Sequence, residues 1–184
     1  MSISFYVMNK KKFLGYEPVL NVEEALSLLD KELNTYGTDG IDINDLLLSP
    51  LSKYPCLLVG AEEESARGFE LSYDNKNKVY GVRIFTPSSR EDWLLALEYI
   101  KALAKKMGTE IVNERGETFT VDNIEKFDYE PDILYGIKVI TENIKSGESS
   151  NYIIFGITKY LRLILYLPCR RSENAISSKT LVLF

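Results

Sequence analysis

Residues 89–107 carry the strongest helix signal in the chain. The pattern of this helix requires a second layer that buries its apolar face. Ser89 is a good N-cap residue, acidic residues occupy the first turn, lysines the last, and Gly108 follows as a C-terminal stop. The apolar residues keep the spacing of a single helix face; they are Trp93, Leu97, Ile100, Leu103, Ala104 and Met107. Because such a face must be buried against another layer, we expect this helix to pack on a sheet.

Alternating apolar and polar residues predict that sheet. Residues 69–73 and 79–85 alternate on either side of a turn at residues 74–77, which is the clearest hairpin pattern in the sequence. Other short stretches are also expected to be strands: residues 3–7, 56–59, 110–112 and 118–121. Consecutive hairpins predict a mainly antiparallel sheet.

Two further helices are expected. Asn21 begins a capping pattern, and apolar residues at helical spacing predict a helix over residues 22–34. A third helix is expected to begin at Pro131 and to end at Gly147. Residues 43–48 fit either a short helix or a strand. Because strands and helices do not alternate strictly, the sequence predicts an α+β fold with about three packed helices.

The charge of the chain is unevenly distributed. The 184 residues have a formal net charge of −5, which disfavours nucleic acid as a partner. Residues 157–184 hold five cationic side chains against one glutamate, a charge of +4 that leaves −9 for residues 1–156. We therefore expect a single domain over residues 1–156, followed by an atypical basic tail over residues 157–184 that is either authentic or the product of a truncation or a shifted reading frame.

The chain contains no histidine, which excludes several classes of enzyme. Catalysis by histidine, Ser-His-Asp and Cys-His triads and HExxH metal sites all require one. Glycine patterns that bind phosphate are absent too, so no cofactor is expected. Cys56 and Cys169 cannot complete a zinc site without histidine. Cys56 lies in an apolar setting and is expected to be buried and inert, and both thiols are expected to be reduced in the cytoplasm.

Carboxylate clusters are the remaining candidates for chemistry. Such clusters can bind a hard cation or form an acid/base pair, but none has the spacing of a calcium-binding loop. Runs of charge are more often solvated faces or helix caps, and we favour that interpretation. The clusters are Asp39, Asp42 and Asp45; Glu62, Glu63 and Glu64; and Asp128, Glu130 and Asp132.

Tyrosines and lysines are candidates for contact with a partner. The chain has 12 tyrosines, a residue type that is enriched at protein interfaces, and Trp93 is expected to be a core residue. The run of lysines from Lys10 to Lys12 fits either contact with an acidic partner or, as we favour, a guard at a sheet edge. The candidate interaction surface comprises Tyr73, Tyr80, Asp128, Tyr129, Glu130 and Asp132.

Three segments resemble one bacterial family. They are residues 2–12, residues 80–93 and residues 119–133, and Thr-Pro-Ser-Ser-Arg-Glu-Asp-Trp at residues 86–93 is the most distinctive stretch. The family, from streptococci and related Gram-positive bacteria, is described only as a domain of unknown function. The resemblance covers about residues 1–155 and implies chains longer than this one, with no catalytic residue to carry over.

Taken together, the residues favour a non-enzymatic cytoplasmic domain that binds another protein through an acidic, tyrosine-rich surface. The alternative is a histidine-free enzyme or a divalent-metal-binding protein that uses the clustered carboxylates. A peripheral membrane role for the basic tail is disfavoured because Pro168 is poorly placed in an amphipathic helix. The longest apolar stretch, residues 152–167, contains two charged side chains and is too short for a transmembrane helix.

Overall fold

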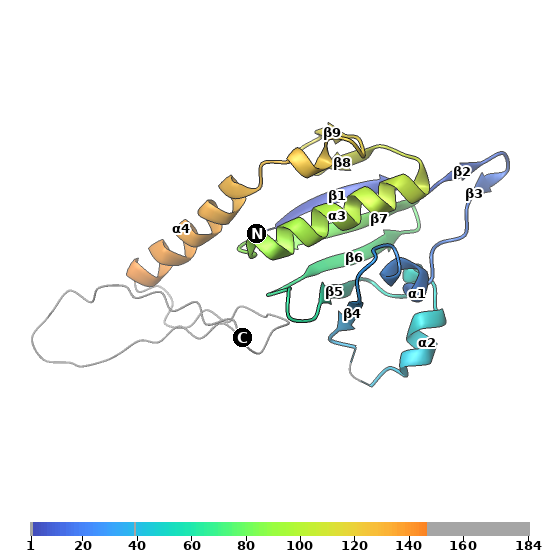
Figure 1. Cartoon of the computed structure of the whole chain (residues 1–184), viewed down its shortest axis with the longest axis horizontal. Helices are drawn as coiled ribbons and strands as arrows, with labels where there is room; N and C mark the ends of the chain where they lie inside the picture. The colour runs from blue at the N-terminus through green and yellow to red at the C-terminus, as the bar shows by residue number, and fades with distance from the viewer. Residues whose placement is uncertain (1, 39, 147–184) are drawn as a thin grey trace, which may run out of the picture.

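The computed structural model of the 184-residue chain describes residues 2–38 and 40–146. A seven-stranded antiparallel sheet forms one layer, and the long helix α3 (Arg90–Met107) lies across one of its faces (Figure 1). The predicted α+β class is confirmed. The basic tail and the other features expected after residue 146 lie outside the described residues.

The first strand of the chain lies inside the sheet. β1 (Ser2–Met8) pairs with β7 on one side and β8 on the other, both antiparallel. α3 connects β7 to β8 and crosses over β1 (Figure 1). From edge to edge the strands are β4 (Leu33–Tyr36), β5 (Leu57–Ala61), β6 (Phe69–Asp74), β7 (Val79–Phe85), β1, β8 (Ile111–Asn113) and β9 (Thr118–Phe119).

The remaining elements flank this body. β2 (Lys11–Lys12) and β3 (Gly15–Tyr16) form a small separate hairpin that projects from one end of the molecule (Figure 1). Residues 43–48, which the sequence left ambiguous, are helical. The other helices within the described ranges are α1 (Val22–Leu26), α2 (Ile43–Leu48), α4 (Glu130–Ser146) and 3₁₀ turns at Leu51–Lys53 and Ile124–Lys126.

The core lies between α3 and one face of the sheet. Alternate residues of β1 point toward the helix, as the period of two predicts: Ile3, Phe5 and Val7 are at most 1% exposed. Trp93 on α3 is 1% exposed and stacks on Phe127, with ring centroids 5.7 Å apart, so its predicted core position is confirmed. Both predicted ends of α3 are also confirmed, with Ser89 as N-cap and a left-handed Gly108 at the C-terminus.

The predicted helix over residues 22–34 is wrong after Leu26. The hydroxyl of Ser27 donates to the carbonyl of Glu23 at 2.8 Å, a local bond that offers the chain an alternative to helix continuation. Residues 33–36 instead form β4, which pairs with β5 and buries Leu33. Pairing along the sheet edge therefore outweighs the helical spacing of these leucines.

Candidate interaction surfaces

The expected interaction surface is not assembled as one patch. Tyr73 and Tyr80 are 7% and 0% exposed, so their expected availability to a partner is wrong. Both point toward the core side of the sheet, with ring centroids 4.8 Å apart. The hydroxyl of Tyr80 accepts from the backbone N–H of Leu20 at 3.0 Å, and burial raises the pKa of Tyr80 to about 12. These two tyrosines are therefore core residues.

The other four candidates gather where α4 begins. Tyr129 stacks on Trp93 with centroids 5.6 Å apart, and its hydroxyl oxygen accepts a hydrogen bond from Arg90 Nε at 3.2 Å. Asp132 pairs with Arg115 at 2.7 Å between Oδ1 and the guanidinium. Asp128 and Glu130 are exposed beside them. This junction links α3, α4 and the β8–β9 turn, so its contacts account for part of the fold as well as offering an acidic surface.

The carboxylate clusters do not form a metal site in the described part of the chain. No group of three or more potential ligands there lies close enough together to hold an ion. Asp42 acts as the N-cap of α2, accepting from the N–H groups of Asn44 and Asp45. Glu64 pairs with Lys31 at 3.2 Å on the surface. Helix capping and solvated pairs are the roles that we favoured for these residues.

The distinctive stretch at residues 86–93 builds a junction rather than a reactive site. The carboxylate of Asp92 is fully buried and accepts from the backbone N–H groups of Ala66, Arg67 and Gly68, the last at 2.7 Å. It also completes the capping box with Ser89. One carboxylate thus fixes the loop before β6 against the start of α3.

Arg67 closes the same junction from the other side. Its guanidinium donates to the carbonyl of Pro87 at 2.6 Å and lies over the ring of Phe85, 4.7 Å from the centroid. Burial lowers the pKa of Arg67, and the charge of Asp92 opposes this effect. These contacts join the loop before β6 to the segment before α3.

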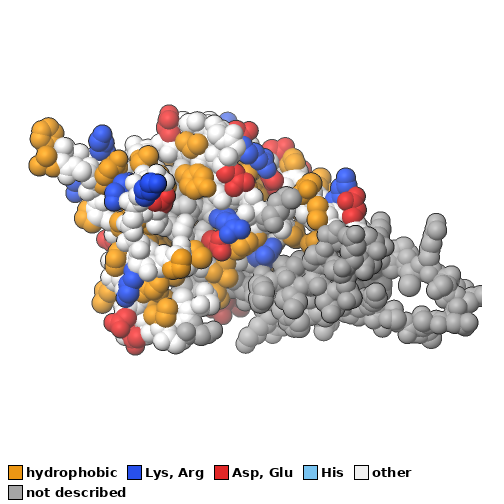
Figure 2. Space-filling model, turned by 180° about the vertical axis from the view of Figure 1, so that it is seen from behind, with side chains coloured by type: hydrophobic (Ala, Val, Ile, Leu, Met, Phe, Trp, Pro, Cys, Tyr) orange, Lys and Arg blue, Asp and Glu red, His pale blue; other side chains and the backbone are white. Residues whose placement is uncertain are grey.

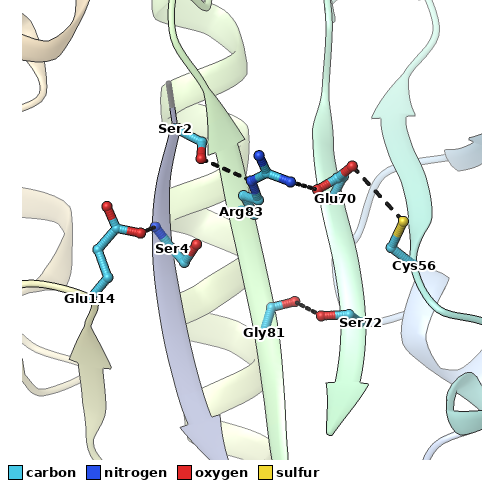
Figure 3. A network of polar contacts seen from close by, with 8 residues as sticks. All are labelled: Ser2, Ser4, Cys56, Glu70, Ser72, Gly81, Arg83 and Glu114. Carbon is cyan, nitrogen blue, oxygen red and sulfur yellow. Dashed lines mark hydrogen bonds and ion pairs between the residues drawn. The ribbon is translucent and has the colours of Figure 1, made fainter.

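The second face of the sheet carries a polar network. Arg83 on β7 donates to Ser2 Oγ at 2.8 Å and to Glu70 at 2.9 Å, and Glu70 contacts the thiol of Cys56 at 3.9 Å (Figure 3). Cys56 is exposed, so the expectation that it is buried is wrong: it precedes β5 at the surface. Partial burial, together with the charge of Glu70, raises the pKa of this thiol. A raised pKa lowers the fraction of Cys56 that is present as the reactive thiolate.

An apolar strip adjoins this network. Tyr6, Met8 and Val112 are 39%, 42% and 39% exposed, and Tyr6 faces Val112 across the β1–β8 pair. Gly81 lies opposite Tyr6 on β7, where a Cβ would stand 2.8 Å from Ser72 Oγ. The ring of Tyr6 lies over this glycine, with Cε1 and Cδ1 at 3.8 and 3.9 Å from the same Cβ position. Within residues 2–38 and 40–146, no helix lies over this face: α3 covers the opposite one (Figure 1), and Figure 2 shows the molecule from behind.

The described residues form a two-layer α+β domain in which α3 covers one face of the sheet and no described helix covers the other. Residues 2–164 match the family described as Domain of unknown function (DUF4299), and the chain belongs to this family. The match reaches beyond residue 155, where we expected the resemblance to end. No curated protein and no solved structure matches the chain. None of the described helices is long and apolar enough to cross a bilayer.

Proposed function

We propose that this chain is a non-enzymatic domain that binds another protein through the uncovered face of its sheet. The observation that carries the proposal is the strip formed by Tyr6, Met8 and Val112 beside the Arg83–Glu70 pair. Aromatic and methionine side chains flanked by polar groups are the composition of protein interfaces. The sheet supplies a rigid platform, so that binding orders few additional groups.

The alternative, a histidine-free enzyme or metal-binding protein, has less support. Three of the carboxylates that it requires are already engaged: Asp42 caps α2, and Glu64 and Asp132 form ion pairs. We also propose that the protein is located in the cytoplasm of a Gram-positive bacterium. The exposed thiol of Cys56 suits a reducing compartment, and the sequence resemblance suits that origin.

Photo-crosslinking in the native host tests the binding face. Benzoylphenylalanine in place of Tyr6 is expected to give a discrete cross-linked protein species. The same probe in place of Leu94, an exposed residue of α3 in the helical layer, is the matched control and should give none. Adding Val112→Lys to the Tyr6 probe should reduce the yield several-fold, because a charge then replaces part of the apolar strip. Equal yields at the two positions, or no product at Tyr6, would contradict the proposal.

A further inference from the structure

The hairpin of β2 and β3 presents two apolar side chains to water. Phe13 and Leu14 form its two-residue tip and are 100% and 89% exposed. Figure 1 shows the β2–β3 hairpin projecting from one end of the molecule, and Figure 2 shows a hydrophobic projection at the upper left. Isolated apolar side chains at a surface are common, but an aromatic and an aliphatic residue together at a projecting tip expose their whole surfaces.

The hairpin is anchored so that its tip cannot fold back on the body. At its base the N–H of Glu17 donates to the carbonyl of Lys10 at 2.9 Å. The buried amide of Asn9 donates to the carbonyl of Glu17 at 2.9 Å and to the hydroxyl of Tyr73 at 3.1 Å. Gly15 has φ +98°, a conformation that favours glycine and closes the turn. The exposure of the tip is therefore a property of the fold.

Lysines surround the base of this hairpin. The β6–β7 turn meets it through the bond from Asn9 N–H to the carbonyl of Lys78, and the end of α3 meets it through the bond from Thr109 to the carbonyl of Met8. Segments 9–17, 74–78 and 105–110 together contain seven lysines and three carboxylates. The lysines of this end are Lys10, Lys11, Lys12, Lys76, Lys78, Lys105 and Lys106.

The expected role of the lysine run as a guard at a sheet edge is wrong. β1, which precedes the run, is an inner strand between β7 and β8, and Lys11 and Lys12 belong to a separate hairpin. Glu17 pairs with Lys10 and Lys12 at 3.4 and 3.6 Å and offsets only part of their charge. The end of the molecule thus stays basic although the whole chain is acidic.

We propose that this basic end binds the surface of an anionic lipid bilayer. Phe13 and Leu14 enter the boundary between headgroups and acyl chains, and the surrounding lysines contact anionic headgroups. The acidic residues elsewhere in the protein repel the anionic bilayer only weakly, because charges more than about 8 Å away are largely screened at physiological salt. The segment is distinct from the basic C-terminal tail, and the proposal is independent of the protein-binding face.

A bilayer fits this tip better than a protein partner does. A stable protein interface buries about 800 Å² on each side, far more than two side chains at a convex tip present. A fluid bilayer accepts a projecting apolar tip without a preformed pocket, and it supplies negative charge on all sides of it. An apolar tip above a base rich in lysines matches that geometry.

Vesicle flotation with the purified full chain tests the proposal. The chain should float with vesicles of phosphatidylglycerol and phosphatidylcholine, should not float with phosphatidylcholine alone, and should be released by high salt. Replacing both tip residues, Phe13→Ser with Leu14→Ser, should lower binding at least tenfold. Leu48→Ser removes a comparably exposed leucine from α2, is the matched control, and should bind like the wild type. The fluorescence of buried Trp93 checks that each variant is folded.

The charge contribution has its own control. Changing Lys10, Lys11 and Lys12 to glutamine should weaken binding to anionic vesicles and flatten its salt dependence. Lys126 and Lys138 are exposed lysines elsewhere in the protein. Changing them to glutamine should alter vesicle binding little. A tryptophan probe, Phe13→Trp, should shift its emission to the blue on anionic vesicles. No flotation at low salt, or equal loss in Leu48→Ser, would overturn the proposal. A different result would assign the hairpin to a protein partner instead. In that case a photoreactive residue at position 13 would cross-link to a cellular protein, and the chain would not bind vesicles.

Discussion

The carboxylate of Asp92 accepts hydrogen bonds from four backbone N–H groups. It accepts from Ala66, Arg67 and Gly68 and from the N–H of Ser89 at 3.2 Å. Fixed N–H groups compensate a buried negative charge well because they lose little freedom when they bind it. This role explains why an acidic residue occupies a position that is 0% exposed.

Replacing Asp92 with asparagine should therefore be costly. The amide keeps one acceptor oxygen, and its NH₂ group would face N–H donors that lose their partner. We expect Asp92→Asn to lower the free energy of unfolding by about 3 kcal/mol, measured by urea denaturation. Asp122→Asn, at an exposed position, is the control and should change it by less than about 0.5 kcal/mol. A loss of equal size in both variants would show that the N–H groups do not depend on the charge.

Helix α4 packs on the body through a glycine. Gly136 is buried against the segment before α3, and a Cβ there would lie 2.7 Å from Thr86 Cγ2 and 3.0 Å from Pro87 Cα. Ile133 and Ile140 flank this contact on the inner face, whereas Ile137 is 37% exposed. The glycine permits an approach of helix and loop that any side chain would prevent.

The sign of the change in the free energy of unfolding in Gly136→Ala tests this contact. In an unconstrained helix this change stabilises by about 1 kcal/mol, but overpacking costs about 1–3 kcal/mol. We expect a net loss of about 1 kcal/mol and faster hydrogen exchange at the amides of α4. The control is Leu134→Ala at an exposed position of the same helix, which should leave exchange near its wild-type rate. If Gly136→Ala were instead more stable than the wild type, α4 and the loop would be able to move apart at little energetic cost.

Local chemistry explains which elements the sequence predicted. The ends of α3 and the β6–β7 hairpin follow from caps and turn residues within a few positions, and both are confirmed. β4 was missed because its formation depends on pairing with β5, about 25 residues away in the chain. The β2–β3 hairpin was missed as well, since Phe13 and Leu14 do not alternate with polar residues. Only the glycine that follows them marked a turn.

Two buried tyrosines join the layers of the whole molecule. Tyr80 on the sheet accepts from the N–H of Leu20, and Tyr99 on α3 donates to the carbonyl of Ala25 at 3.1 Å. Both hydroxyls thus hold the segment around α1 against the core. Burial raises the pKa of Tyr99 as well as that of Tyr80, because an ionised ring would lose its hydration.

This arrangement predicts a loss of global stability in alkali. The pKa of Tyr80 is about 12 in the folded protein, against about 10 for an unfolded tyrosine. Its contribution is fully present below pH ~10 and is lost as the pH rises toward ~12. Urea unfolding followed by Trp93 fluorescence should show this decline above pH ~10, and Tyr80→Phe should make it shallower while costing about 1 kcal/mol at neutral pH. An unchanged slope in Tyr80→Phe, with exposed Tyr135→Phe as the control, would contradict the assignment.

The candidate surface was less predictable than the fold. Tyr73 and Tyr80 alternate along a hairpin, but alternation does not say which face the helix covers. The uncovered strip is assembled from Tyr6 and Val112, which lie more than 100 residues apart and meet only through sheet register. Its residues carry no local signal, although Gly81 in the middle of a strand pattern marked a close approach.

The inner position of β1 also sets an order of events during synthesis. Its two partners end at Phe85 and Asn113, so residues 2–8 emerge long before either strand exists. At roughly 5–20 residues per second, Ile3, Phe5 and Val7 wait at least about 5 s for the second partner. A newly made chain must therefore carry an uncovered apolar strand until Asn113 has been translated, and this strand is the segment on which chaperones or self-association would act first.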